Sequence, residues 1–265
     1  MTSVHDAAPP LGELRGGWVR GGLRLLAIPL VTAACWMAWL AAGVGRGGAQ
    51  RREALVRTWA QVMTRILNIN IERLGDPPER PFLLVTNHLG YLDVMVLMTL
   101  VDAVFIAKRE VRGWPMFGPL ARIVGTIFID RDSSRDTLRV AAAMSGALAA
   151  GRGVVLFAEG TSSDGSRVLP LRPALLDGAA RSGWPVYVAS LSYRTGPGDP
   201  PAAEVLCWWG DMTFLPHLAG VCRLRRSHAR VAFGERPVLA ADRRVLAGRL
   251  HEALTRSFVP SGHAN

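Results

Sequence analysis

From residue 69 onward, short apolar runs rich in β-branched residues alternate with segments of helical periodicity. This alternation is typical of an α/β domain in which helices cover a parallel or mixed sheet. The expected strands are Ile69–Leu74, Phe82–Thr86, Val104–Ala107, Thr126–Ile129, Val154–Ala158, Val186–Ser192, Glu204–Trp209 and Ala229–Phe233. The expected helices lie near 92–101, 114–123, 134–150, 173–182 and 241–258. The pattern therefore predicts a mixed, largely parallel sheet flanked by helices.

A run of 20 uncharged residues, Leu25–Val44, precedes this domain. In a helix that rises about 1.5 Å per residue, the run spans about 30 Å, the thickness of a bilayer core. It is longer than the apolar region of a cleaved signal peptide, and a buried soluble helix is seldom apolar all round. We expect a membrane-inserted anchor. Pro29 would kink it, so a full span and a bend that returns to the same side both stay open.

A second helix is expected over Ala49–Leu67, with Trp59 and Met63 on its apolar stripe and arginines on its other faces. This pattern suits a helix at an anionic lipid surface, and equally a core-facing helix with a solvated basic side. The adjacent apolar run favours the lipid surface. We expect membrane-associated helices over residues 1–68 and an α/β domain over residues 69–265.

The composition narrows the classes of function. The chain has 265 residues, 49% of them hydrophobic, and a net charge of +10, which indicates an anionic partner such as nucleic acid or a membrane. Because the basic residues are spread along the chain rather than clustered among aromatic ones, no nucleic-acid partner is expected. The three cysteines lack C-x-x-C spacing, which indicates a reducing compartment and no metal site.

Polar residues follow three of the predicted strands, at the positions where α/β domains carry their chemistry. The first group contains His88 and, five residues later, Asp93. A carboxylate that accepts from one imidazole nitrogen fixes the tautomer and leaves the other nitrogen as a base. Such a base can take the proton of a substrate hydroxyl that attacks a carbonyl. The alternative is a helix-capping Asp beside a structural His, because so short a motif also arises by chance.

The second and third groups add polar side chains at two further strand ends. The second ends in Asp130 and Arg131, where Arg suits bidentate recognition of phosphate or carboxylate. Its alternative is a surface Arg paired with a neighbouring Asp. The third is Glu159, Gly160 and Thr161, followed by a Ser/Gly-rich loop that suits polar substrate groups, or else a tight turn with a capping Glu. Three such groups in one α/β domain favour a functional site.

In this order, the three groups resemble the motifs of the lysophospholipid acyltransferases of the 1-acylglycerol-3-phosphate acyltransferase type. The family's N-H-x-x-x-x-D and G-x-x-F-I-D-R blocks match in full. Its E-G-T-R block matches except at Ser162, where the family has Arg. The resemblance covers about residues 60–240. It implies the α/β acyltransferase fold with an N-terminal helical pair in the membrane.

The resemblance also implies an activity: transfer of an acyl chain from an acyl-carrier-protein or coenzyme A thioester to a lysolipid hydroxyl, with no further cofactor. His88 would be the general base, Asp93 would orient it, and Arg131 would bind the acceptor's phosphate. The other candidate substrate-binding residues are Asn87, Lys108, Glu159, Gly160, Thr161 and Arg172. We expect the chain at the cytoplasmic (inner) membrane, with its active site facing the cytoplasm and membrane lipids as partners.

Two segments, Glu159–Arg172 and Cys207–Met212, resemble the lyso-ornithine-lipid acyltransferase branch of the family. Ornithine lipids carry no phosphate, so Ser162 in place of Arg fits that branch, yet Arg131 is retained. Lysophosphatidate and lyso-ornithine lipid therefore both stay open as acceptors, as does a catalytically silent membrane-binding paralogue. A serine hydrolase is disfavoured because the sequence has no G-x-S-x-G elbow.

Overall fold

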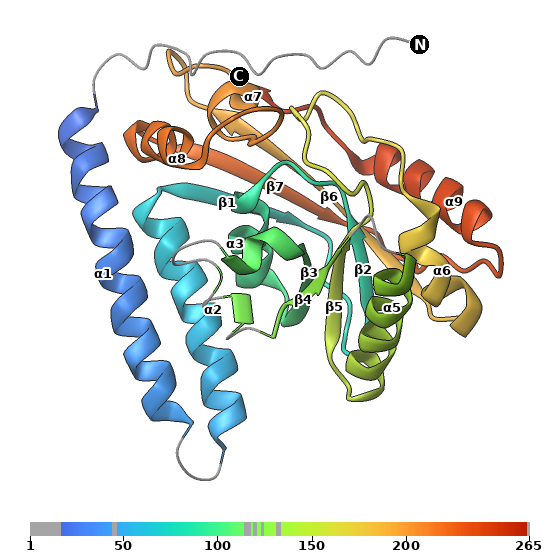
Figure 1. Cartoon of the computed structure of the whole chain (residues 1–265). Helices are drawn as coiled ribbons and strands as arrows, with labels where there is room; N and C mark the ends of the chain where they lie inside the picture. Colours follow the sequence, from blue (N-terminus) through green and yellow to red (C-terminus); the bar gives the residue numbers. More distant parts are fainter. Residues whose placement is uncertain are drawn as a thin grey trace.

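The computed structural model describes residues 17–43, 47–113, 118, 121–122, 125–130 and 134–263. Within them, one sheet has the strand order β1-β7-β6-β2-β5-β3-β4, and β8 pairs with β6 (Figure 1). Neighbouring strands run parallel except β6 and β7, which are antiparallel. The strands are β1 (Ile69–Leu74), β2 (Leu83–Thr86), β3 (Ala103–Lys108), β4 (Ile127–Ile129), β5 (Gly153–Phe157), β6 (Val186–Thr195), β7 (Ser227–Phe233) and β8 (Gly262–His263).

Helices cover both faces of this sheet. The helices are α1 (Trp18–Ala42), α2 (Gly48–Ile66), α3 (Tyr91–Leu100), α5 (Ser134–Ala149), α6 (Pro173–Ser182), α7 (Ala202–Val205), α8 (Phe214–Arg223) and α9 (Arg243–Ser257), with a 3-10 turn at Arg109–Gly113. Side chains alternate across the strands, so Leu84 enters the core under α2, α3 and α8 while Leu83 and Val85 enter the core under α5, α6 and α9. Burial on both faces explains why these strands read as continuous apolar runs.

The predicted fold class is confirmed, but one predicted strand is wrong. Glu204–Trp209 begins inside α7 and continues as irregular chain. Its backbone hydrogen bonds are local, because the Leu206 N–H donates to the Ala202 carbonyl, and Trp208 N–H donates to Leu89 O instead of joining a strand. Sequence reasoning also missed α8, whose apolar side places Leu218 and Val221 in the core. Most of the expected helix at 114–123 lies outside the described residues.

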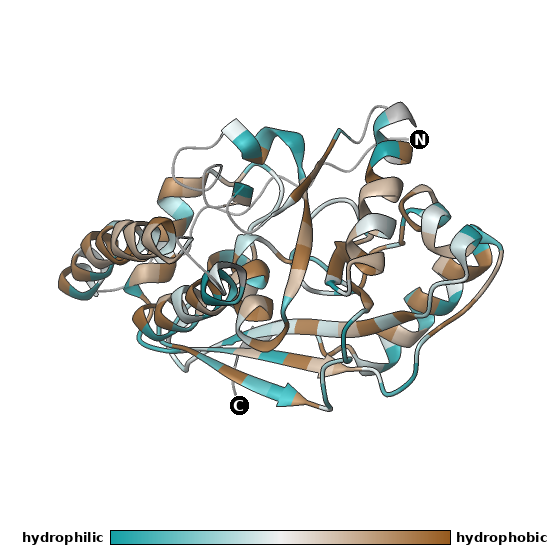
Figure 2. Cartoon of the chain, turned by 90° about the horizontal axis from the view of Figure 1, so that it is seen from below, coloured by the Kyte–Doolittle hydropathy of each residue, from teal (hydrophilic) through white to brown (hydrophobic). Residues whose placement is uncertain are grey.

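The first helix is uninterrupted at Pro29 and leaves most of its apolar surface exposed. By length and composition α1 could cross a membrane, and its buried residues are Gly21 and Ile28 alone. Figure 2 shows hydrophobic residues along this helix at the side of the molecule. The amino-terminal arginines turn inward: Arg20 donates to the Arg223 carbonyl, and Arg24 to two carbonyls at the end of α8. Guanidinium groups thus satisfy the unpaired carbonyls that end a helix.

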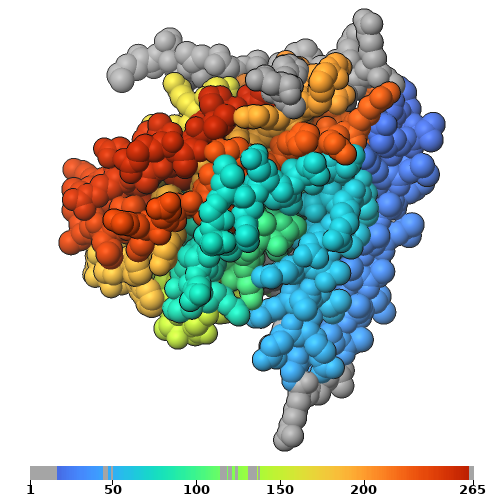
Figure 3. Space-filling model, turned by 180° about the vertical axis from the view of Figure 1, so that it is seen from behind, coloured from blue at the N-terminus to red at the C-terminus, as the bar shows by residue number. Residues whose placement is uncertain are grey.

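The apolar stripe of α2, which we expected at a lipid surface, instead faces the core of the protein. Trp59, Met63 and Leu67 are buried in the same core as the sheet and Ile28 of α1. The core-facing alternative is therefore the one observed for the carboxyl-terminal half of α2. The division at residue 68 stays a prediction, although both parts share a core. Figures 1 and 3 show α1 and α2 side by side, with their far ends extending beyond the sheet.

Candidate active site

The chemistry-bearing residues gather at the carboxyl ends of β2 and β5, which are parallel neighbours in the sheet. β2 ends at Thr86, and the turn that follows leads into α3. His88 lies in this turn, with its ring stacked on the ring of Phe157 from β5, at 4.1 Å between centroids. The predicted arrangement, with functional groups just after parallel strands, is the one observed.

His88 and Asp93 form a hydrogen-bonded pair. The distance from His88 Nδ1 to Asp93 Oδ2 is 2.8 Å, and the side chains are 19% and 0% exposed. Because an ionised carboxylate only accepts, Nδ1 carries the proton and Nε2 is the basic nitrogen. In the described part of the chain no protein group bonds Nε2. Asp93 therefore caps α3, as the alternative has it, and also bonds the His88 ring. The general-base role of His88 stays a prediction.

The Asp93 carboxylate accepts hydrogen bonds at both of its oxygens. Its Oδ2 accepts from His88 Nδ1 and from the backbone N–H groups of Leu89 and Gly90, at 2.6 and 3.0 Å. Its Oδ1 accepts from the hydroxyl of Tyr193, at 2.9 Å. The amino terminus of α3 adds a dipole that acts on a negative charge at this position in the same favourable direction as these hydrogen bonds. Tyr193 is a residue that sequence reasoning missed, because nothing near it in the sequence marks it.

Gly90 is required at the turn for steric reasons. Its φ of 151° lies in the range that disfavours side chains, and a Cβ would lie 3.0 Å from Trp208 N. Trp208 approaches this closely because its N–H donates to Leu89 O, at 2.7 Å. The segment after α7 is thereby fastened over the His88 turn, which explains why it does not join the sheet.

Glu159 and Asn87, both predicted to bind substrate, are engaged with the backbone. Glu159 is 3% exposed, and its carboxylate accepts from the N–H groups of His88 (2.9 Å) and Leu169 (2.8 Å). Burial raises the pKa of Glu159 to about 7, although both hydrogen bonds act in the other direction. Asn87 exchanges two hydrogen bonds with the backbone of Leu191 on β6. These contacts fix the turn that carries His88, and substrate binding by either residue stays a prediction.

The other two residues of the E-G-T motif, Gly160 and Thr161, lie against Arg172 and at the cavity, respectively. Gly160 has a φ of 75°, and a Cβ there would lie 2.5 Å from Arg172 Nε, so the guanidinium side chain lies directly against the turn. Thr161 and Ser162 line the cavity that contains His88. Arg131 lies outside the described residues. Its neighbour Asp130 is paired with Arg109, at 2.9 Å.

This cavity has a volume of about 430 Å³, and its wall is mostly apolar. Its apolar lining includes Trp59, Met95, Met98, Phe105 and Phe157. The cation Lys108 also lines it and pairs with Glu110, at 3.5 Å. Binding sites are commonly apolar cavities with a few polar groups, and here one of those groups is His88, whose Nε2 bonds no group among the described residues.

At the wall of the cavity, Tyr91 forms a second, partly buried hydrogen bond with His217. The hydroxyl of Tyr91 lies 3.0 Å from His217 Nδ1, and His217 Nε2 lies 3.1 Å from the Cys207 carbonyl. Burial lowers the pKa of His217 to about 4, so the ring is neutral at pH 7. Nε2 therefore donates to the carbonyl and Nδ1 accepts from Tyr91. Both ring nitrogens are thus engaged within the protein, which gives His217 a structural role.

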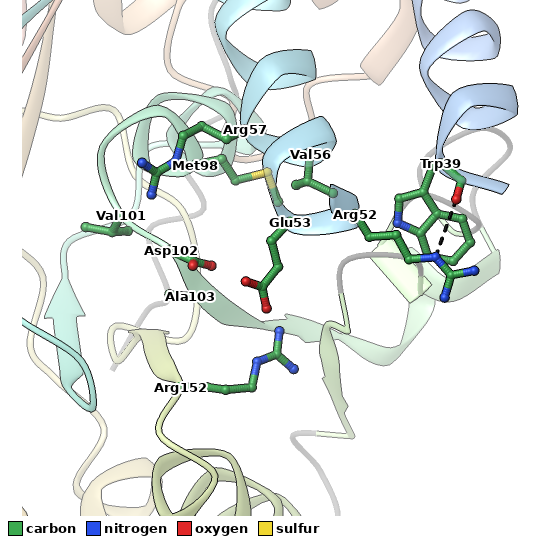
Figure 4. A pocket seen from close by; sticks show the side chains of 10 residues that line it. All are labelled: Trp39, Arg52, Glu53, Val56, Arg57, Met98, Val101, Asp102, Ala103 and Arg152. Carbon is green, nitrogen blue, oxygen red and sulfur yellow. Dashed lines mark hydrogen bonds between the residues drawn. The ribbon is translucent and has the colours of Figure 1, made fainter. Parts of the chain in front are cut away.

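A second hollow, of about 340 Å³, lies between α2, the end of α3 and the start of β3 (Figure 4). In Figure 4, Arg152 points toward Glu53, and Arg52 turns toward Trp39, over whose ring it stacks. Asp102, on the same wall, pairs with Arg80 at 2.6 Å. Charges of both signs already face each other here, so this hollow identifies no class of ligand.

The fold is that of an α/β acyltransferase. The crystal structure of the 1-acyl-sn-glycerophosphate (LPA) acyltransferase from Thermotoga maritima matches with a TM-score of 0.60 and 19% identity, over 88% of this chain and 95% of that one. The acyltransferase family model matches residues 66–193.

Proteins with similar sequences identify the family to which the chain belongs. The chain is 37% identical to the lyso-ornithine lipid O-acyltransferase of Rhizobium meliloti, over 69% of this chain and 67% of that protein. It is 34% identical to the enzyme of the same name from Brucella abortus, over 82% and 85%. It is 31% identical to the 1-acyl-sn-glycerol-3-phosphate acyltransferase of Neisseria meningitidis, over 63% and 69%. The chain therefore belongs to this family of lysolipid acyltransferases, and it is an acyltransferase.

Proposed function

We propose that this chain is a membrane-bound O-acyltransferase that moves an acyl chain from an acyl-carrier-protein or coenzyme A thioester to a lysolipid hydroxyl. The observation that carries the proposal is the His88–Asp93 pair, 2.8 Å apart, beside an apolar cavity of about 430 Å³. The histidine supplies a base near neutral pH, and the apolar wall suits an acyl chain.

In the proposed reaction, His88 Nε2 accepts the proton of the acceptor hydroxyl while the hydroxyl oxygen attacks the thioester carbonyl. A C–O bond forms, and the carbonyl becomes a tetrahedral oxyanion. The C–S bond then breaks, the carbonyl is restored, and the departing thiolate takes the proton from the imidazolium. The products are the acylated lipid and the free thiol, and His88 is neutral again.

Asp93 and Phe157 support this step in different ways. The Asp93 carboxylate holds the imidazole in one tautomer and stabilises the imidazolium that forms. The Phe157 ring covers one face of the imidazole and keeps water from it. A base positioned in this way accelerates proton transfer by about 10²–10⁴.

For the acceptor, we propose lyso-ornithine lipid. Relatives at 37% and 34% identity bear that name. Ser162 places a neutral side chain on the cavity wall where the family's block has a cation, which fits a head group without phosphate. Lys108 offers its ammonium to the carboxylate of such a head group. Arg172 lies against the turn at Gly160, two residues before Ser162.

Lysophosphatidate is the second candidate acceptor. A relative at 31% identity is named for phosphate-containing acceptors. Arg131 would bind the phosphate, as the resemblance of its motif implies, and Lys108 would assist.

We further propose that the enzyme works at the cytoplasmic (inner) membrane with its site facing the cytoplasm. The exposed apolar surface of α1 supports insertion into the bilayer. Cys35, Cys207 and Cys222 are free thiols, which supports a reducing compartment.

The test is an acyl-transfer assay with the full chain in membranes, read by mass spectrometry. Acyl-carrier-protein and coenzyme A thioesters are supplied separately, with either lyso-ornithine lipid or lysophosphatidate. We expect product mainly with lyso-ornithine lipid, and a loss of at least about 100-fold in His88→Ala. The matched control is His228→Ala on β7, a histidine outside the cavity lining, which keeps wild-type activity.

Each other outcome changes a stated part of the proposal. Product from lysophosphatidate alone would make this a phosphatidate-forming enzyme. Near-normal transfer by a folded His88→Ala protein would remove the general-base role. Absence of product with both acceptors, from folded wild-type protein, would favour the silent membrane-binding paralogue.

A further inference from the structure

Tyr193 reaches the catalytic pair from a distant part of the chain. β6 and β2 pair in parallel from Leu83 opposite Val186 to Thr86 opposite Ala189. β6 then continues to Thr195, past the end of β2 and beneath the turn that carries His88. This extension brings the Tyr193 hydroxyl to 2.9 Å from Asp93 Oδ1, and both side chains are fully buried.

The Tyr193 hydroxyl donates to Asp93 Oδ1, whereas His88 Nδ1 donates to the other oxygen, Oδ2. Burial and the charge of Asp93 raise the pKa of Tyr193, so the phenol keeps its proton and donates. A charge-assisted hydrogen bond of this kind draws negative charge toward Oδ1, away from the oxygen that faces the imidazole. The Tyr193 hydroxyl can therefore influence the basicity of His88 as well as the orientation of the carboxylate.

We propose that Tyr193 is a positioning residue, which holds the Asp93 carboxylate in the plane that His88 needs and moderates its negative charge. The proposal rests on the proposed function, in which His88 is the general base. It goes beyond the sequence motifs, because Tyr193 lies outside all of them.

A purely structural role, in which Asp93 only satisfies a buried phenol, makes a different prediction. It would affect folding stability and leave the titration of His88 unchanged. The titratable groups near Asp93 are Glu159, Tyr91 and Cys207, and His217 bonds to Tyr91. Lys108 and Glu110 line the same cavity as His88. They are the same in wild type and in a Tyr193 variant, so a difference between the two reports on the removed hydroxyl.

The experiment compares Tyr193→Phe with wild type in the acyl-transfer assay across pH. We expect kcat to fall about tenfold, because a hydrogen bond to a charged group is lost, with the acceptor KM unchanged. The Asp93 charge then acts more strongly on His88 and raises its pKa. We therefore expect the acid limb of kcat/KM to move up by about half a pH unit.

The matched control is Tyr187→Phe, on the same strand and the same side but without a hydrogen bond to Asp93. It should keep the wild-type profile. Site-specific 3-fluorotyrosine at position 193 keeps the ring and has a more acidic hydroxyl. This stronger donor should move the acid limb down, which preserves the test if Tyr193→Phe fails to fold.

NMR titration of the His88 imidazole, assigned with His88→Gln, separates this proposal from the proposed function. We expect the pKa of His88 to be higher in Tyr193→Phe than in wild type, whether or not the protein transfers acyl chains. Unchanged kcat, acid limb and imidazole titration in a folded Tyr193→Phe protein would overturn the proposal. A shifted titration without His88-dependent activity would overturn the proposed function and leave the coupling established.

Discussion

Glu159 links the active-site turn to the stability of the protein. Its carboxyl is buried against the backbone of His88 and Leu169, and burial raises its pKa to about 7 from the usual 4.5. Below pH 4.5 the group is protonated in the folded and the unfolded chain alike. Between pH 4.5 and 7 the unfolded chain ionises this carboxyl while the folded chain keeps it protonated, so this contribution to stability is lost as the pH rises toward 7. The pKa of His217 is lowered to about 4, so its contribution to stability instead increases as the pH rises from about 4 to 6.5.

We expect Glu159→Gln to remove this pH dependence. The free energy of unfolding of wild type relative to the variant should fall by about 2 to 3 kcal/mol between pH 5 and pH 8, with most of the fall below pH 7 and a plateau above it. The measurement is denaturant unfolding in detergent at several pH values. Taking the difference between the two proteins cancels the contribution of His217. Parallel curves would mean that Glu159 is already ionised at pH 5.

Among the individual residues, the pair His88–Asp93 was predicted from the sequence, but the hydrogen-bond partners around it were not. A strand followed by a turn and a helix places residues five apart within reach of each other, so the contact is local. Tyr193 is 100 residues from Asp93, and only the parallel pairing of β2 with β6 brings them together. Glu159 was predicted from its motif, but its use of both oxygens on backbone N–H groups depends on the same long-range packing.

Secondary-structure elements with strong periodicity were predicted closely, and those fixed by tertiary contacts were not. Ile69–Leu74 was predicted to the residue as a strand because it alternates β-branched and polar residues. Glu204–Trp209 has strand-like composition, but Pro201 begins a short helix there and Trp208 bonds to the His88 turn. The role of α2 was also decided by packing, since an apolar stripe looks the same toward lipid and toward a core.

The exposed face of α1 makes a prediction about membrane attachment. Leu30 and Met37 are 70% and 64% exposed, so a charge at either position leaves the packing against α2 and α8 intact. In hydrocarbon, each charge costs about 3 kcal/mol. We expect Leu30→Glu with Met37→Glu to release folded protein from carbonate-washed membranes. Leu138→Glu on α5, 62% exposed, is the matched control and should stay bound. Retention of the double variant would mean that this face of α1 does not insert.

Across the whole molecule, charge and apolar surface have separate roles at a membrane. The net charge of +10 attracts the chain to anionic lipid over a distance that salt limits to about 10 Å at 0.1 M ionic strength. Insertion of α1 buries apolar surface, which salt does not weaken. We expect wild type to bind vesicles of anionic phospholipid faster at low salt than at 1 M salt, and to remain on them in flotation when salt is then raised.

The Leu30→Glu, Met37→Glu variant separates these two contributions. Having kept most of its positive charge but lost its apolar face, it should float with anionic vesicles at low salt and leave them at 1 M salt. Neutral phosphatidylcholine vesicles should retain wild type and fail to bind the variant. Dissociation of wild type from anionic vesicles at high salt would mean that attachment is electrostatic throughout, because inserted apolar surface has no salt-dependent route of release.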